Sequence, residues 1–149
     1  MELRYTIAAR LRLLHNWNCP WSEAALPRGA YLGEYGELVA LSWLRAQGYK
    51  ILRHRFRLGS SGEVDIICRK GDLLVFAEVK SASGNAAGRP ARRVNEHKRT
   101  LLRRAASLWL RRLDEEVPSR MDVIEVLLPP GGKPKVNHII GAFPLRKER

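Results

Sequence analysis

Two short apolar segments separated by a tight turn constrain the fold of this chain of 149 residues more than any other feature. Residues 63–69 and 73–80 are rich in Val, Ile and Phe, and Lys70-Gly71-Asp72 separates them. A two-residue loop with glycine first is typical of a type II′ turn, so this pattern predicts a β-hairpin in which residues 70 and 73 face each other. The chain must therefore build a sheet around this hairpin.

The same register gathers charged side chains at the open end of the hairpin. It places Asp65 opposite Glu78 and Glu63 opposite Lys80. Directly opposed residues have Cβ atoms about 4.5–5.5 Å apart, and like charges at that separation are destabilising. Glu78 and Lys80 are two residues apart, so both project from the same face as Asp65. A folded chain tolerates the acid pair if one acid takes up a proton, if Lys80 neutralises the pair, or if a divalent cation bridges it.

The third alternative predicts a metal site. Oxygen ligands suit Mg²⁺ or Mn²⁺, which keep several waters and also accept phosphate oxygens. In that interpretation Asp65 and Glu78 hold the ion, and Lys80 orients or deprotonates a water or stabilises developing negative charge. The competing interpretation is an exposed hairpin with a surface Glu78–Lys80 ion pair worth about 0–1 kcal/mol. Geometry alone leaves both open.

Helical and strand-like patterns alternate along the rest of the chain. Helices are expected over residues 31–47 and, after a cap at Asn95, over residues 95–113; further strands are expected over 49–58, 121–128 and 136–140, and a loop over 81–94. The order α-β-β-β-α-β-β predicts an α/β fold with a central mixed sheet flanked by helices. The second helix should bury Leu102, Ala106, Trp109 and Leu113.

The first of these helices carries an acid aimed at the core. Glu37 lies one turn before Leu41 on the apolar stripe, so it should point toward the sheet and could supply a third acid to the metal site. The residues before this helix are breaker-rich. We expect residues 1–29 to form an extension with a short amphipathic helix and a linker, and residues 30–149 to form one domain.

Charge predicts the kind of partner. The chain has 27 Lys and Arg against 15 Asp and Glu, a formal net charge of +12, which favours a polyanion such as nucleic acid. Arginines at positions 53, 55 and 57 have the period of one strand face. Lys98 and Arg99 fall near a predicted helix N-terminus, where the helix dipole disfavours cations unless an anion neutralises them. The predicted phosphate contacts are Arg53, Arg55, Arg57, Arg92, Arg93, Lys98, Arg99 and Arg103.

Apolar runs are far shorter than the roughly 20 residues that cross a bilayer, and the N-terminus has no secretion signal pattern. Two cysteines, Cys19 and Cys68, form no disulfide framework, and Cys68 should lie in the core. We therefore expect a cytoplasmic protein with no membrane contact.

Several short motifs, taken in order, form a family pattern. They are Gly33-Glu34-Tyr35-Gly36-Glu37, Gly48-Tyr49-Lys50-Ile51-Leu52, Gly62-Glu63-Val64-Asp65-Ile66-Ile67 and Val75-Phe76-Ala77-Glu78-Val79-Lys80, continued by Lys98, Arg120-Met121-Asp122-Val123, His138-Ile139 and Ala142-Phe143. This pattern resembles the bacterial YraN-like family, an uncharacterised group with a restriction-endonuclease-like fold related to Holliday junction resolvases. The chain departs from the family at Ala82, where an arginine is usual, and at Arg55, where an asparagine is common.

The resemblance implies residue roles. It implies that Asp65 and Glu78 are metal ligands, helped by the Val79 carbonyl, that Lys80 is the catalytic lysine, and that Glu37 is the helix-borne acid of resolvase-like members.

Together these observations predict a Mg²⁺- or Mn²⁺-dependent endonuclease that acts on structured or branched DNA. One alternative is a nucleic-acid-binding protein that keeps the nuclease fold without turnover. Another is a protein-interaction module whose basic face binds an acidic partner. A homodimer is expected by analogy with resolvases, which act on two-fold symmetric junctions.

Overall fold

A computed structural model describes residues 30–83, 94–129 and 132–146. The predicted N-terminal helix and linker, together with Arg92 and Arg93, lie outside the described residues. The elements are α2 (Ala30–Ala46), β1 (Lys50–Phe56), β2 (Val64–Lys70), β3 (Leu73–Ser83), α3 (Glu96–Leu110), β4 (Ser119–Leu128) and β5 (Lys135–Phe143). The predicted α-β-β-β-α-β-β order is confirmed.

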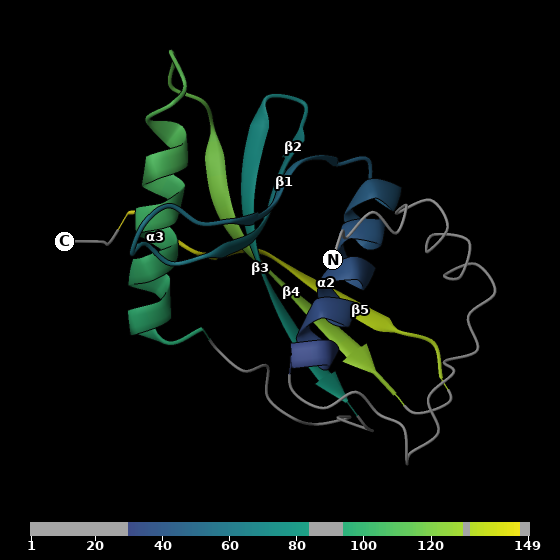
Figure 1. Ribbon diagram of the computed structural model, residues 1–149. Helices are drawn as coiled ribbons and strands as arrows, with labels where there is room; N and C mark the ends of the chain where they lie inside the picture. The colour runs from purple at the N-terminus through teal and green to yellow at the C-terminus, as the bar shows by residue number, and fades with distance from the viewer. Residues whose placement is uncertain (1–29, 84–93, 130–131, 147–149) are drawn as a thin grey trace, which may run out of the picture.

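The five strands form one sheet in which spatial order follows chain order (Figure 1). β3 and β4 are parallel, and the other neighbouring pairs are antiparallel, so the predicted mixed sheet is confirmed. Parallel neighbours need a long crossover connection, and α3 lies within it. Neither described helix combines the length and the apolar character needed to cross a membrane.

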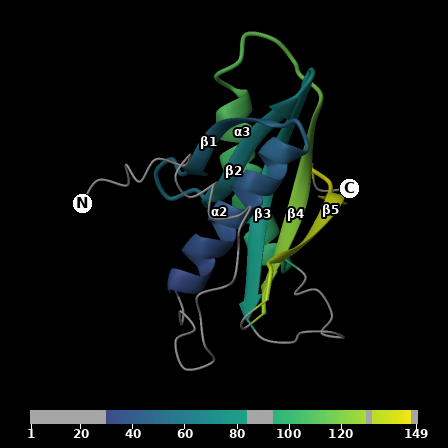
Figure 2. The same cartoon turned by 90° about the vertical axis from the view of Figure 1, so that its right-hand side faces the viewer.

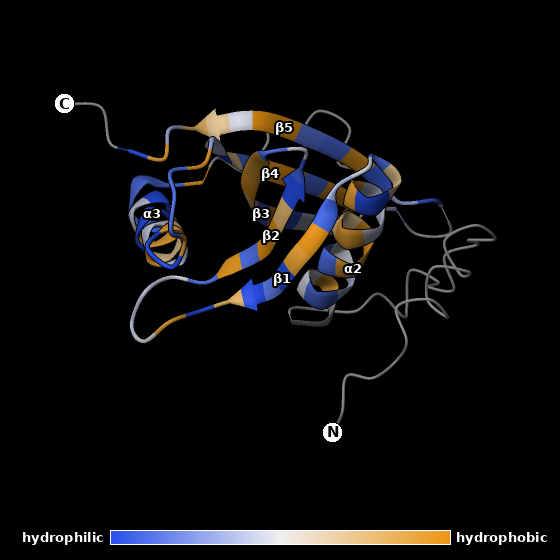
Figure 3. Cartoon of the chain, turned by 90° about the horizontal axis from the view of Figure 1, so that it is seen from above, coloured by the Kyte–Doolittle hydropathy of each residue, from blue (hydrophilic) through white to orange (hydrophobic). Residues whose placement is uncertain are grey.

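One helix covers each face of the sheet (Figures 2 and 3). α2 buries Leu41 and Leu44 against a face that includes Cys68, which is in the core as predicted. α3 packs on the opposite face, where its buried side chains Leu102, Ala105 and Ala106 meet residues such as Phe76 and Met121. Since successive side chains of a strand alternate between faces, each strand feeds both layers of the core.

Three predicted boundaries were wrong by three residues, and one of them is the end of β5, which runs to Phe143 and not to residue 140. Residues 81–83 belong to β3 and not to a loop, because they pair in parallel with residues 126–128 of β4. The second helix ends at Leu110, so Leu113 leaves the helical register and is 37% exposed instead of buried. Ala105 joins the buried stripe of α3, and Trp109 packs at its edge.

The predicted hairpin register is confirmed along most of its length. Lys70 pairs with Leu73, and the ladder continues to Ile66 and Ala77. Gly71 has a φ of +59°, a left-handed conformation that favours glycine at this turn position. The ladder ends at Ile66–Ala77, so the two predicted steps beyond it, Asp65–Glu78 and Glu63–Lys80, do not form as backbone partners.

Candidate active site

Asp65 stands where the β2–β3 ladder ends, and its side chain explains that ending. Asp65 Oδ2 accepts a hydrogen bond of 2.7 Å from the backbone N–H of Val79 on β3. A carboxylate therefore takes the donor that a further ladder step would have used. Asp65 is 8% exposed and Glu78 is 3% exposed, so the predicted acid pair is buried and not on an exposed hairpin.

Glu78 lies between two lysines from different elements. Its Oε1 atom is 3.3 Å from Lys80 Nζ on β3 and 3.4 Å from Lys98 Nζ on α3. Lys98 was predicted as a phosphate contact, and its contact with Glu78 was missed. The predicted cap is confirmed, since Asn95 Oδ1 accepts from the Lys98 backbone N–H at 2.9 Å. The negative charge of Glu78 explains how a lysine is tolerated in the first turn of α3.

Burial is the main cause of an unusual ionisation at Asp65. Burial, followed by the negative charge of Glu78, raises the pKa of Asp65 to about 8, although the Val79 N–H bond and Lys98 act in the opposite direction. At neutral pH and without a metal, the protein therefore accommodates the acid pair in two of the predicted ways at once. The raised pKa favours the protonated form of Asp65, and Lys80 and Lys98 lie beside Glu78 and balance its charge.

The oxygen atoms of the site fit a divalent cation. Glu78 Oε2 is buried and has no hydrogen-bond partner among the described residues. Burying a carboxylate oxygen without a partner costs free energy, and binding of a hard cation by that oxygen would offset the cost. Within the described parts of the chain, no three His, Cys, Asp or Glu side chains form a metal-holding group. Two carboxylates suit Mg²⁺ or Mn²⁺, because the remaining positions can be taken by water and phosphate oxygens.

Glu37 points from α2 toward the sheet as predicted, but it meets β1. Its Oε2 atom is 2.6 Å from His54 Nε2 and accepts from Arg55 Nε at 2.8 Å. Burial raises the pKa of Glu37, but the hydrogen bonds of His54 and Arg55 outweigh it, and the net pKa is lowered. Glu37 is thus held as a charged carboxylate whose field helps to raise the pKa of Asp65. Its role as a third metal ligand stays a prediction.

A close approach between α2 and β3 sets the position of Glu37. A Cβ atom on Gly36 would overlap the side chain of Ser81. Glycine at this position therefore lets the helix lie directly on the strand that carries Glu78 and Lys80.

The predicted arginine row on β1 was wrong. The register shifts between Ile51 and Arg53, and Arg55 has a φ of +54°, so the alternation of side chains along the strand is broken. Arg55 turns to Glu37 on α2, whereas Arg53 shares a pocket with Trp109 of α3. Arg57 lies beyond the end of the strand. The three arginines therefore do not line one strand face.

Two of the predicted phosphate contacts on α3 also have structural partners. The guanidinium groups of Arg99 and Arg103 lie 5.2 and 5.7 Å from the ring centroid of Phe143. Arg103 Nη1 also donates to Glu96 at 2.7 Å, and its Nε donates to the Pro144 carbonyl at 3.0 Å. These contacts fix β5 to α3 and leave Lys98 as the cation of this helix that reaches the acid pair.

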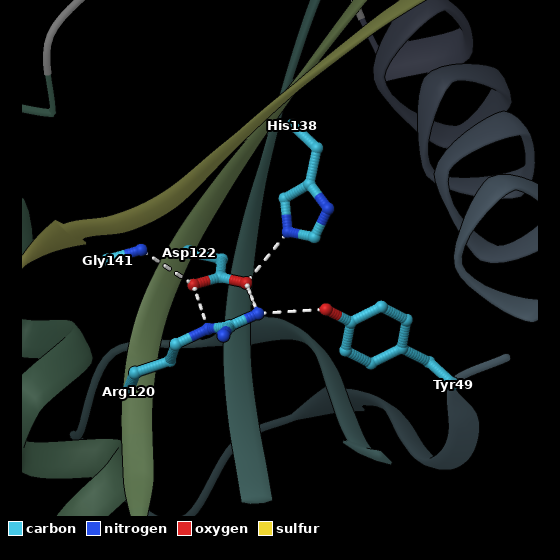
Figure 4. Close-up of polar contacts among 5 residues, drawn as sticks. All are labelled: Tyr49, Arg120, Asp122, His138 and Gly141. Atoms are coloured by element: carbon cyan, nitrogen blue, oxygen red, sulfur yellow. Dashed lines mark hydrogen bonds and ion pairs between the residues drawn. The ribbon is translucent and has the colours of Figure 1, made fainter. Parts of the chain in front are cut away.

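A second buried polar cluster was missed, and Figure 4 shows it. Asp122 is fully buried and accepts hydrogen bonds from Arg120 Nε at 2.9 Å and from the Gly141 N–H at 2.9 Å. His138 Nε2 lies 2.7 Å from its other oxygen, and Arg120 also donates to the hydroxyl of Tyr49. Asp122 shares the α2 face with Ile124, whereas Glu78 shares the α3 face with Phe76. The signals in the sequence were an acid within an apolar strand and the family motifs that contain Arg120, Asp122 and His138.

A mixed sheet with one helix on each face, and an acid pair with a lysine on two neighbouring strands, defines an α/β domain with a restriction-endonuclease-like core. A family model described as "Uncharacterised protein family UPF0102" matches residues 36–126. The chain belongs to this family, which is the YraN-like family that the motifs resembled.

Curated relatives extend this match. The chain is 40% identical over 116 residues to a UPF0102 protein of Streptomyces coelicolor, covering 76% of this chain and 88% of the relative. It is 42% identical over 113 residues to a UPF0102 protein of Symbiobacterium thermophilum, covering 75% and 95%. A UPF0102 protein of Syntrophomonas wolfei is 41% identical over 113 residues, covering 75% and 96%.

The acid pair should lower the free energy of unfolding as pH rises, and Asp65→Asn should reveal this effect. The pKa of Asp65 is raised from 3.8 to about 8 on folding, so the folded chain binds more protons than the unfolded chain between these values. The contribution of Asp65 to the free energy of unfolding therefore falls as pH rises through this range. We expect the asparagine variant, which keeps an acceptor for the Val79 N–H, to gain stability relative to the parent between pH 5 and pH 9.

Urea unfolding of both proteins across this pH range measures the effect. Asp72→Asn is the matched control, because Asp72 is an exposed acid on the same hairpin. A parent that gains stability relative to Asp65→Asn as pH rises would contradict the assignment.

Proposed function

We propose that this protein is a Mg²⁺- or Mn²⁺-dependent endonuclease that hydrolyses phosphodiester bonds in structured or branched DNA. The observation that carries the proposal is the buried pair Asp65 and Glu78, with Lys80 and Lys98 both within 3.4 Å of Glu78 Oε1. A protein that needed only to fold would gain by replacing such a pair with apolar residues. Retaining it is understandable if the carboxylates bind a cation.

The side chains divide the work. Asp65 and Glu78 would hold the metal ion, and Glu78 Oε2 is the oxygen left without a partner. The bound ion would polarise the scissile phosphate and lower the pKa of a water molecule. Lys80 and Lys98 are 34% and 32% exposed, so their ammonium groups can reach solvent and a phosphate at the same site. They would position that phosphate and stabilise negative charge on its oxygens.

The charge of the chain supports a nucleic-acid substrate. The formal net charge is +12, and α3, which carries Lys98 to the acid pair, has four Lys or Arg residues and one acid, Glu96. Phosphate groups would compensate this excess. The preference for branched DNA comes from the likeness to resolvases that the motifs imply.

A nucleic-acid-binding protein without turnover is the second candidate. The observation in its favour is the pairing of Glu37 with His54 and Arg55, which satisfies the third acid without a metal. This candidate uses the same basic surface and predicts binding but no cleavage.

A cleavage screen tests the proposal. The full chain is incubated with fluorescent four-way junction, flap, linear duplex and single-stranded DNA of matched sequence, with Mn²⁺, Mg²⁺ or a chelator. We expect cleavage that requires the metal and is fastest on the junction or the flap. Saturable binding to these DNAs with no cleavage under any condition would reject the nuclease and leave the binding protein.

A further inference from the structure

A pocket lined by three arginines lies at the other end of α3 from Lys98. It is formed by Leu52, Arg53, Phe56, Arg57, Trp109 and Arg112, and its volume is about 360 Å³. We refer to it as the arginine pocket. Such a volume is at the lower end of the range for ligand pockets and admits a phosphate group with part of its nucleoside.

Two of the residues that line the arginine pocket are aromatic. The rings of Phe56 and Trp109 pack edge to face, with centroids 5.1 Å apart and an interplanar angle of 84°. The guanidinium carbon of Arg112 lies 5.2 Å from the Phe56 ring centroid, a cation–π distance. The aromatic pair thus holds an arginine at the pocket without using its hydrogen-bond donors.

In the described part of the chain, none of the ion pairs involves Arg53, Arg57 or Arg112. Like charges that line one pocket repel one another, and the ion pairs of the described residues do not relieve that repulsion at these three arginines. An anion with several oxygen acceptors would relieve the repulsion, and arginine donors match the oxygens of a phosphate.

The charges around the arginine pocket indicate the side on which a nucleic acid would lie. A second cavity adjoins it, shares Leu52 and Trp109, and carries four acids: Asp72, Asp114, Glu115 and Glu116. These acids repel a polyanion on the hairpin side. Along α3, Trp109 lies eleven residues after Lys98, about 16 Å at 1.5 Å per residue. That span corresponds to about five nucleotides of one strand at 3.4 Å each.

From these observations we propose that the arginine pocket binds a backbone phosphate of a nucleic-acid strand about five nucleotides from the strand position at Lys98. The proposal shares the nucleic-acid ligand of the proposed function but does not need its chemistry. The pocket would anchor the strand at one end of α3 while Glu78 and the two lysines face it near the other end.

Binding to a fluorescent 20-base-pair duplex, measured by anisotropy in a chelator over a range of salt concentrations, tests this proposal apart from cleavage. We expect Arg112→Gln to weaken binding and to lower the log–log salt slope by about 0.9, the value for one lost phosphate contact. Arg112→Lys, which keeps the charge, should retain the slope. Arg111→Gln is the matched control, because Arg111 is the exposed neighbour outside the pocket and should leave the slope unchanged.

The other results overturn the proposal. Equal slope changes for Arg112→Gln and Arg111→Gln would show that only overall charge matters. Calorimetric titration with inorganic phosphate and with a mononucleotide distinguishes the source of the phosphate. Arg112-dependent binding of these small ligands, with an unchanged duplex slope, would assign the pocket to a free phosphate compound. No metal is added in these binding experiments. If the protein binds DNA in this way but never cleaves it, the proposed role of the arginine pocket is supported and only the nuclease proposal is rejected.

Discussion

Lys80→Gln and Asp65→Asn are each expected to lower metal-dependent cleavage by about 10²–10⁴-fold, the usual effect of removing a group that moves or stabilises charge in the transition state. Lys80 is one of two ammonium groups on Glu78 Oε1, and Asp65 is the partner acid of the proposed metal site. Lys98→Gln should cause a smaller loss, because Lys80 still contacts Glu78. Single-turnover cleavage of the best substrate, with enzyme in excess, separates this chemistry from product release.

Two control variants on the same hairpin test whether loss of any charged side chain lowers cleavage. Lys70→Gln removes an exposed lysine that lies over the Tyr49 ring, and Asp72→Asn removes an exposed acid. Both should cleave as the parent does. The metal-centre assignment fails if Asp65→Asn cleaves at the parental rate, since the residual activity would then come from another site or another protein.

Asp122→Ala is expected to lower the free energy of unfolding by about 3–5 kcal/mol, the cost of breaking a buried charge pair. The substitution leaves Arg120, His138 and the Gly141 N–H without their shared acceptor. These groups come from β4 and β5, and Arg120 also reaches Tyr49 before β1, so the loss should loosen the α2 side of the sheet. Urea unfolding at pH 7 measures it.

Glu125→Ala is the control for this prediction. Glu125 is on the same strand and accepts from Asn137 at an exposed position, so its loss should cost about 1 kcal/mol or less. Equal costs for the two variants would contradict a special role for Asp122.

The pH dependence of the Asp122 effect follows from its ionisation. Burial raises the pKa of Asp122, but hydrogen bonds from His138, Arg120 and the Gly141 N–H outweigh it and bring the net pKa below 3.8. Its contribution to stability is therefore complete above pH 3.8 and is lost as pH falls through the folded pKa. The difference between Asp122→Ala and the parent should begin to shrink below pH 3.8.

Local patterns in the sequence predicted the features whose partners are near in the chain. The turn at Gly71 set the hairpin register, and Asn95 set the start of α3. The hairpin register alone also predicted that Asp65 and Glu78 lie close together. The order of helices and strands was enough to predict a mixed sheet between two helices.

Features that depend on distant contacts were not predicted. Lys98 contacts Glu78, which is 20 positions earlier in the chain, and Arg120 contacts Tyr49, which is 71 positions earlier. A strand pattern also assumes regular alternation, which fails where Arg55 takes a positive φ. Positions of this kind are decided by how α2 and α3 pack on the sheet, and no short window of residues encodes that packing.

The repulsion between the two buried acids has a consequence for the history of the gene. If Asp65→Asn raises the free energy of unfolding, a gene copy that is no longer under selection would readily lose the proposed metal site. Decayed duplicates should then differ first at these acids, while the Asp122 cluster on the opposite face persists because its loss is expected to lower the free energy of unfolding by about 3–5 kcal/mol. Decayed copies of the gene would therefore be recognised by substitutions at Asp65 or Glu78 together with an unchanged Asp122 cluster.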